Sequence, residues 1–321
     1  DFADHNGFKD SIHAHNRTLR WETDGRESSV ALDDTNGWTF IVNGKSDGSA
    51  REDAATMVMS GLLPAALHPA PRKVLLIGHG TGTTAGWLAQ VPGIERVDVV
   101  EIEAAILEVA EACRAVNFDV PDNPKVNVII GDGREHLLSS KERYDIIFSE
   151  PSNPYRAGIA SLFSQDFYDG VQDRLEDGGI FVQWFQGYHV DAELVRTAYA
   201  TISSVFPVVE TWTVHYFDMA FTASKQAIEH DAGRLRARLA QQPFFDALRY
   251  TWGVSGVEGL YSAYLANGDF ARSVAEIEGH WVNTDDRPII EFGFARNAGR
   301  TGLFSIPALH QLATARGQQR P

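Results

Sequence analysis

The most constraining feature of this 321-residue sequence is an alternation of short apolar runs with longer amphipathic segments, which begins at Lys73. The apolar runs predict strands at 74–77, 97–100, 126–130, 144–148 and 180–184. Helical patterns follow them at 82–90, 103–116, 133–138, 165–175 and 191–205. Such alternation predicts an α/β fold in which helices cover both faces of a parallel sheet.

The flanking regions have different patterns. Residues 28–33 and 38–43 are rich in β-branched and aromatic side chains, and Asn36-Gly37 between them is a hairpin signal. A helix is expected over about 52–67, and 68–73 (HPAPRK) predicts a linker into the main domain. The runs 208–214 and 219–222 are expected to pair as an antiparallel hairpin at one sheet edge.

We therefore expect a small N-terminal β unit with its linking helix (1–68), a Rossmann-like domain (69–225) and a C-terminal helical extension (226–321). The Gly-, Arg- and Gln-rich end of the chain is expected to fray.

Composition limits the class of partner. The chain has 28 basic and 43 acidic side chains and a formal charge of −15. This argues against a dedicated nucleic-acid binder, which neutralises phosphates with Lys and Arg, and suits a cationic substrate.

Cysteine content and hydropathy bear on location. The single cysteine, Cys113, cannot form an internal disulfide, and no apolar run is long enough to span a bilayer. We expect a cytoplasmic protein, or the soluble domain of a membrane-attached one, without a membrane span in this chain.

The segment GHGTGTTAG follows the first strand and opens a helix. Gly78, Gly80 and Gly82 would let the backbone approach a ligand and leave amide donors at the helix start. Glu101 ends the second strand about twenty residues later, and Asp132 follows the third strand. Alone, the glycines could form a ligand-free turn and Asp132 could cap its helix. Together they predict a nucleoside site at the carboxyl ends of the strands.

The fourth strand ends in SEPSNP, which places Ser149, Glu150, Ser152 and Asn153 at the same edge. At these residues the sequence resembles the spermidine synthase-like aminopropyltransferases, over roughly residues 28–224. It is most similar to the subgroup often fused to membrane helices, which has similar SEPSNP, AG, LF and NTDDRP blocks. In this chain the last block is residues 283–291.

The resemblance implies that the site holds S-adenosylmethionine or its decarboxylated form as co-substrate, without a metal. Glu101 would bind the ribose hydroxyls, and Asp132 with Gly133 would read the adenine amino group. The donor-binding set implied by the resemblance is Gly78, Gly80, Thr81, Gly82, Glu101, Ile102, Asp132, Gly133 and Ser149.

Three departures from the polyamine-making pattern are visible. Thr81 replaces an Asp that anchors the donor amine in spermidine synthases, and Glu150 opens the run that in them begins with the catalytic Asp. Their Tyr-Gln-Glu substrate motif falls near 56–58 (Thr-Met-Val), none of which can replace it. Putrescine recognition is therefore not expected from the sequence.

Transfer from a sulfonium carbon requires a neutral nucleophile aligned about 3–3.5 Å behind that carbon. An aliphatic amine is mostly protonated at neutral pH, so a carboxylate that binds the ammonium and accepts its proton is expected. Glu150 is the candidate base, although it could instead be a structural carboxylate bonded to the amides of the SNP turn. Asn153 could orient the acceptor or simply form the turn.

Several further residues are expected to rim the site. Tyr155, Trp184 and Tyr188 could contact a cation through their rings, or could only pack. The acids Asp285, Asp286 and Glu291 could fold over the pocket, but a solvated turn beginning at Asn283 is the expected arrangement.

The leading hypothesis is alkyl transfer of the aminopropyl type to a small-molecule amine. Methyl transfer, aminocarboxypropyl transfer or cyclisation of intact S-adenosylmethionine is the main alternative, because Thr81 removes a charge that would repel the methionyl carboxylate. A non-catalytic nucleoside-binding module and an NAD-dependent oxidoreductase are further alternatives. A homodimer is left open.

Overall fold

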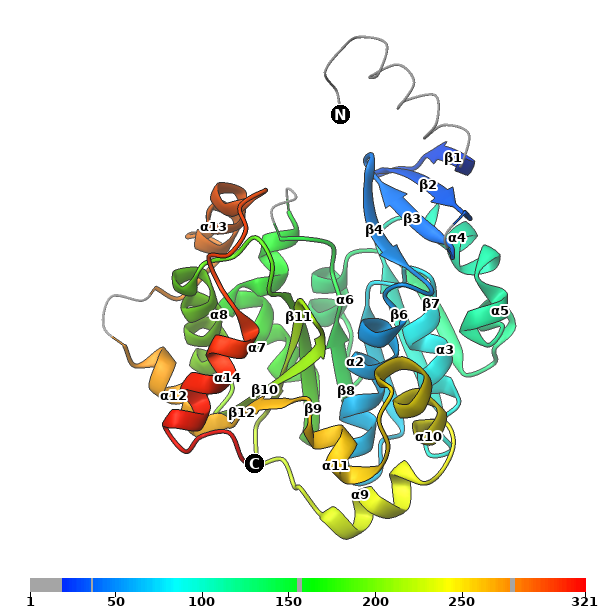
Figure 1. The fold of residues 1–321 in the computed structure, drawn as a ribbon. Helices are drawn as coiled ribbons and strands as arrows, with labels where there is room; N and C mark the ends of the chain where they lie inside the picture. Colours follow the sequence, from blue (N-terminus) through cyan, green and yellow to red (C-terminus); the bar gives the residue numbers. More distant parts are fainter. Residues whose placement is uncertain (1–18, 36, 155–157, 278–280) are drawn as a thin grey trace.

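The structure, a computed structural model, describes residues 19–35, 37–154, 158–277 and 281–321. Its centre is a sheet with the strand order β12-β10-β11-β9-β8-β5-β6-β7, and a second, antiparallel sheet has the order β1-β2-β3-β4 (Figure 1). The strands of the central sheet are β5 Lys73–Ile77, β6 Arg96–Glu101, β7 Val126–Ile130, β8 Tyr144–Ser149, β9 Leu175–Gln186, β10 Val208–His215, β11 Asp218–Ser224 and β12 Tyr264–Ala266.

The central strands are buried because their alternate side chains serve two cores. In β5, Leu75 and Ile77 pack into one hydrophobic cluster, and Val74 and Leu76 pack into the other. Strands β7, β6, β5, β8 and β9 pair in parallel. Their carboxyl ends therefore lie at one edge of the sheet. The α/β, Rossmann-like class predicted from the alternation is confirmed.

Helices cover both faces of this sheet (Figure 1). One face is covered by α6 Gly133–Ser139, α7 Gln165–Arg174, α8 Ala192–Val205, α12 Gly268–Ala275, α13 Ile289–Asn297 and α14 Ile306–Ala315. The other is covered by α2 Ala54–Leu67, α3 Thr83–Ala89, α9 Ala232–Leu239, α10 Phe244–Ala247 and α11 Gly256–Tyr261. The helices on each face thus exclude water from one set of alternating strand side chains.

The small N-terminal sheet consists of β1 Leu19–Asp24, β2 Ser29–Asp33, β3 Thr39–Val42 and β4 Lys45–Ser49. The expected strands near 28–33 and 38–43 are present as β2 and β3, whereas β1 and β4 were not predicted. Asn36 of the expected hairpin signal lies outside the described residues. Glu103 joins this sheet to the central one, since its carboxylate Oε2 accepts the backbone N–H groups of Glu27 (2.8 Å) and Ser28 (3.1 Å).

Three expectations about the central domain require correction. The helix expected over 103–116 is divided at Cys113 into α4 Ile106–Ala112 and α5 Arg114–Asn117. Strand β9 begins at Leu175 rather than near residue 180, and its pairing with β8 contains a register shift between Tyr144 and Ile146. The β10–β11 hairpin is antiparallel as predicted, but it is not at the edge, because β12 pairs with β10 outside it.

The C-terminal third contains more than helices. It contributes β12 to the central sheet and is tied back at its end. Asn267 donates its backbone N–H to the Gln318 carbonyl (2.9 Å) and its side-chain amide to the Arg320 carbonyl (2.8 Å). The fraying expected for the tail is therefore wrong for these residues. The domain boundaries at residues 68 and 225 stay predictions.

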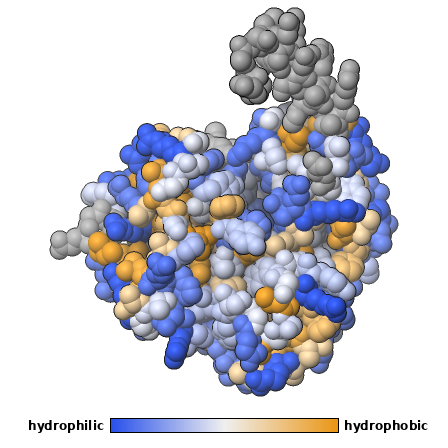
Figure 2. Space-filling view, viewed as in Figure 1, coloured by the Kyte–Doolittle hydropathy of each residue, from blue (hydrophilic) through white to orange (hydrophobic). Residues whose placement is uncertain are grey.

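The surface facing the viewer in Figure 2 mixes hydrophilic areas with smaller hydrophobic ones. Exposed apolar side chains include Tyr216 and Phe217 at the tip of the β10–β11 hairpin. Within the part of the chain that the structure describes, no helix has the length and hydrophobicity needed to cross a bilayer.

Candidate active site at the carboxyl edge of the sheet

The glycine loop lies between β5 and α3 and has the backbone conformation that glycine permits. Gly78, Gly80 and Gly82 have φ angles of 102°, 51° and 75°. A Cβ atom at Gly78 would lie 2.7 Å from the backbone oxygen of Glu150. A larger residue at Gly78 would therefore push the loop away from the end of β8.

Glu101 ties this loop to the end of β6. Its carboxylate Oε2 accepts the backbone N–H of His79 (2.8 Å), and Oε1 accepts that of Glu103 (2.9 Å). Burial raises the pKa of Glu101, whereas these backbone hydrogen bonds lower it. Ile102, the next residue, is 48% exposed. The buried carboxylate is thus held in one orientation by local backbone donors.

The buried imidazole of His79 lies within the same loop. Burial lowers the pKa of His79 to about 4, so the ring is neutral at physiological pH. A neutral ring adds no positive charge to the glycine loop.

Asp132 caps α6 after β7. Its Oδ1 accepts the backbone N–H groups of Arg134 (2.6 Å) and Glu135 (3.2 Å). Gly133 packs closely on β5, since a Cβ there would lie 2.7 Å from Cγ2 of Ile77. The capping role considered from the sequence is present, and Oδ2 has no hydrogen-bond partner among the described residues.

Thr81 occupies a neutral, enclosed position in the loop. Its side chain is buried, and its Oγ1 lies 2.7 Å from Oγ1 of Thr83 and 3.3 Å from the sulfur of Met57. No charge is therefore presented at this position.

Glu150 lies at the end of β8 beside the glycine loop. Its backbone N–H donates to the Ile77 carbonyl, and its Oε2 accepts a hydrogen bond from Oγ1 of Thr84 (3.1 Å). Burial raises the pKa of Glu150 to about 8, and the charges of Asp218 and Asp53 act in the same direction. The carboxyl is bonded to a helix hydroxyl rather than to the amides of the SNP turn. The preceding residue, Ser149, is fully buried, and its hydroxyl has no partner among the described residues.

Asn153 is held by side chains from separate parts of the chain. Its Nδ2 donates to Oε1 of Gln186 (2.6 Å) and to the hydroxyl of Tyr188 (3.0 Å). Its Oδ1 accepts a hydrogen bond from Nζ of Lys45 (2.7 Å), which comes from the N-terminal sheet. Burial raises the pKa of Tyr188 to about 12. The Asn153 amide is thus already engaged by protein groups.

Asp218 is a candidate site residue that the sequence patterns do not identify. It opens β11 opposite Gln186 of β9, is buried, and accepts a hydrogen bond on Oδ2 from Oγ1 of Thr56 (3.0 Å). Burial raises the pKa of Asp218 to about 6, whereas the hydrogen bond from Thr56 lowers it. The other oxygen, Oδ1, is buried and has no hydrogen-bond partner among the described residues.

Two signals in the sequence could have identified Asp218. It is a lone acid at the start of an otherwise uncharged strand, DMAFTAS, and it follows two aromatic residues at a hairpin tip. Thr56, which lies near where spermidine synthases have their Tyr-Gln-Glu motif, donates a hydrogen bond from its hydroxyl to Asp218.

The aromatic predictions have different outcomes. Trp184 is buried in β9, and its indole N–H has no partner among the described residues. Tyr188 contacts Asn153. Tyr155 lies outside the described residues.

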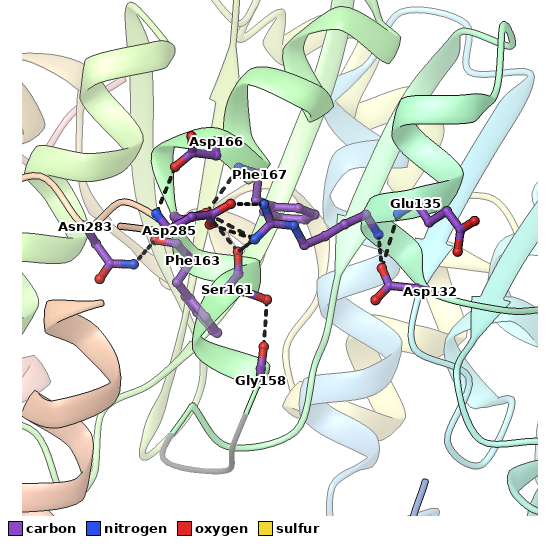
Figure 3. Close-up of polar contacts among 11 residues, drawn as sticks. Asp132, Glu135, Gly158, Ser161, Phe163, Asp166, Phe167, Asn283 and Asp285 are labelled. Carbon is purple, nitrogen blue, oxygen red and sulfur yellow. Dashed lines mark hydrogen bonds and ion pairs between the residues drawn. The ribbon is translucent and has the colours of Figure 1, made fainter. Parts of the chain in front are cut away.

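The late acidic block forms the exposed turn expected from the sequence at residues 284–287, but its first residue, Asn283, does not face solvent. Asn283 is buried, and it donates its side-chain amide to the Phe163 carbonyl (3.0 Å). Asp285 pairs with Arg134, which follows Asp132 in the chain (Figure 3). Asn283 thus anchors an otherwise exposed turn to the loop before α7.

Comparisons with known proteins agree with this architecture. Residues 55–218 match the family model described as the spermine/spermidine synthase domain. A polyamine aminopropyltransferase of Desulforudis audaxviator is 28% identical over 198 residues, which cover 61% of this chain and 72% of that protein. Polyamine aminopropyltransferase 1 of Bacillus cereus is 26% identical over 201 residues, covering 62% and 73%.

Solved structures show the same fold. The crystal structure of spermidine synthase from Thermotoga maritima matches with a TM-score of 0.64 and 20% identity, over 80% of this chain and 87% of that one. A probable spermidine synthase from Corynebacterium glutamicum matches with a TM-score of 0.57 and 18% identity, over 83% and 96%.

Proposed function

Because the chain belongs to the spermine/spermidine synthase domain family and is a spermidine synthase-like transferase, we propose that it moves the aminopropyl group of decarboxylated S-adenosylmethionine to a small amine. The proposal assigns the donor to the ends of β5, β6 and β7 and the acceptor to the ends of β8 and β11. Its main support is a pair of acids, Glu150 and Asp218, whose pKa values are raised to different extents at the acceptor side.

The donor side supplies fixed acceptors of hydrogen bonds. Each oxygen of Glu101 accepts one backbone N–H, so further lone pairs remain for the ribose hydroxyls. Oδ2 of Asp132 is left for the adenine amino group, with Gly133 beside it. Gly78, Gly80 and Gly82 would allow the loop backbone to approach the sulfonium nucleoside.

The acceptor side separates an anchor from a base. With a pKa of about 6, Asp218 is mostly ionised at neutral pH and would hold an ammonium group of the acceptor. With a pKa of about 8, Glu150 is a stronger base than an ordinary carboxylate, so it is better matched to an amine proton. Binding of a cationic donor and a cationic acceptor favours the ionised form of Glu150.

In the transfer step, the neutral amine nitrogen attacks the aminopropyl carbon bonded to sulfur. A carbon–nitrogen bond forms while the carbon–sulfur bond breaks, and its electron pair goes to sulfur, giving neutral methylthioadenosine. Before this attack, the acceptor ammonium gives one proton to the Glu150 carboxylate, and the product nitrogen keeps its remaining protons as an ammonium. Asn153, held by Gln186 and Tyr188, would keep the turn after Glu150 in place.

Thr81 favours a second candidate, transfer from intact S-adenosylmethionine. Its hydroxyl is directed to Thr83 and Met57 and carries no charge, so it neither attracts the amine of the decarboxylated donor nor repels a carboxylate. Methyl or aminocarboxypropyl transfer is therefore retained as the alternative.

Product analysis tests the proposal. The full chain is incubated with each donor and with diamines of graded length, and products are separated by mass. Methylthioadenosine together with an aminopropylated amine, formed only from the decarboxylated donor, is the expected result. Adenosylhomocysteine would establish methyl transfer instead, and unconsumed donor would refute a transferase acting on these amines.

A further inference from the structure

The NTDDRP block, although remote in sequence, is built into the loop that follows the catalytic strand β8. The Asn283 side chain donates to the Phe163 carbonyl, and its Oδ1 accepts the backbone N–H of Ile290 (3.0 Å). The Asn283 carbonyl accepts the backbone N–H of Gln165 (2.8 Å). These bonds fix the backbone of residues 283–290 against η2 (Ile159–Phe163) and the start of α7.

Asp285 reaches from this segment to the donor-side helix α6. Arg134 donates through Nη1 to Oδ1 of Asp285 (2.8 Å) and through Nη2 to Oδ2, a bidentate pair (Figure 3). Ser164 donates its hydroxyl to the same Oδ1 (2.8 Å), and the Asp285 backbone N–H donates to Oδ2 of Asp166 (2.9 Å). Bidentate geometry adds directional constraint to the charge attraction.

Arg134 also holds the loop after β8. Its Nη1 donates to the Ser161 carbonyl (2.9 Å), and its side chain is 22% exposed. The guanidinium therefore joins three separate pieces of chain: the α6 turn, the η2 loop and the NTDDRP segment. A surface ion pair without a structural role would not connect these three segments.

The position of Arg134 makes this network relevant to the donor. Its backbone N–H donates to Oδ1 of Asp132, two residues earlier, so side chain and backbone of one residue connect Asp285 to the Asp132 carboxylate. In Figure 3, Asp132 and Asp285 lie at opposite ends of this network. On its other side, the Asp132-Gly133 turn rests against Ile77. The turn is thus held between β5 and the Arg134–Asp285 pair.

We propose that Asp285, acting through Arg134, is a positioning residue that keeps the Asp132-Gly133 turn in register for the adenine of the donor. The inference rests on the proposed donor site. Its physical reason is that α6 has only seven residues and its first turn carries the adenine contact, so a small rotation of α6 would misplace Asp132. The NTDDRP block would then be a distant part of the donor site rather than a separate lid.

Calorimetry with methylthioadenosine and with both donors tests this on the full chain. Asp285→Asn should weaken binding of all three by about tenfold, because the Arg134 guanidinium loses its ionic partner. The KM for the acceptor amine should stay within about twofold of the wild-type value. Asp285→Glu should restore part of the affinity, since it restores the carboxylate.

Asp286→Asn is the matched control. It removes the same charge from the neighbouring exposed residue of the same block. Equal losses in the Asp285 and Asp286 variants would overturn the inference, because they would report net charge. Melting temperatures of both variants separate a local effect from loss of the fold.

A double mutant identifies the route. If Asp285 acts through Asp132, Asp285→Asn should cost little further affinity in an Asp132→Asn background. An undiminished loss there would refute the route. Wild-type protein that binds methylthioadenosine but transfers nothing would refute the proposed function alone, whereas failure to bind any adenosyl compound would refute both.

Discussion

The two sides of the site hold their acids in different ways. On the donor side, Glu101 and Asp132 accept backbone N–H groups from residues close to them in the loops that follow β6 and β7 or in the glycine loop. On the acceptor side, Glu150 and Asp218 are bonded by single hydroxyls, Thr84 and Thr56, and burial raises both pKa values. Glu101 and Asp132 are thus stabilised by backbone donors, whereas Glu150 and Asp218 have fewer donors and raised pKa values, which a bound cation would lower.

The largest expected effect comes from a substitution at the acceptor side alone. Glu150→Gln keeps the size of the side chain and an oxygen that can accept from Thr84, but it cannot take the amine proton. We expect kcat to fall by about 10² or more, with donor affinity nearly unchanged. Steady-state kinetics and calorimetry measure these two quantities.

The pH dependence sharpens the same prediction. A base with a pKa of about 8 in the free enzyme predicts that wild-type kcat/KM rises with pH and levels off near that value. The residual activity of Glu150→Gln should lack this ionisation. Turnover equal to that of the wild type would remove Glu150 from the mechanism.

The second largest effect is expected from a substitution at the donor side. Glu101→Gln places an NH₂ group against one of the backbone donors, His79 or Glu103, and removes the charge that would bind the ribose. We expect donor affinity to fall by about 10- to 100-fold, since charge-assisted hydrogen bonds contribute about 1.5–3 kcal/mol. The exposed Glu108→Gln is the matched control and should bind like the wild type.

Asp218→Asn should have a smaller effect, restricted to the acceptor. The amide oxygen can still accept the Thr56 hydroxyl, but the ammonium anchor is lost. The expected result is an increase of about tenfold in the KM for the amine, with an unchanged donor dissociation constant. A shift in donor binding instead would show that Asp218 belongs to the donor side.

The smallest effect concerns stability. The folded-state pKa of Glu150, about 8, lies above the ordinary value of 4.5, so the folded protein holds this proton more tightly than the unfolded chain. That stabilisation is complete below the unfolded pKa and is lost as pH rises through the folded pKa. Glu150→Gln should therefore raise the melting temperature at about pH 9 by roughly 2–4 °C, relative to its effect at about pH 5. Thermal unfolding of both proteins at each pH measures this, and a pH-independent difference would contradict it.

Much of the donor side followed from local pattern. Strand ends, glycines and the acids after them are adjacent in sequence, so spacing alone placed Gly78, Glu101 and Asp132 at one edge of the sheet. Their individual roles toward a donor remain predictions. Neighbouring parallel strands end at the same edge of the sheet, so residues that directly follow these strands lie close together. This can be predicted from the order of the strands alone.

The residues of the acceptor side could not be predicted from local sequence patterns. Asp218 meets Thr56 across 162 positions, and Lys45 meets Asn153 across 108. The sequence pattern marks residues 56–58 only as the place of a missing motif, and no local pattern pairs Thr56 with Asp218. Likewise, Asn283 looked like the start of a solvated turn, yet it is buried against Phe163.

The sequence by itself determined the α/β class, the order of the central elements and the family, because hydrophobic periodicity and short motifs are local properties of the chain. Only the tertiary structure decided which distant polar groups share a buried environment, and therefore which carboxyls have raised pKa values. Desolvation depends on everything packed around a group, and packing between remote segments leaves no fixed spacing in the sequence.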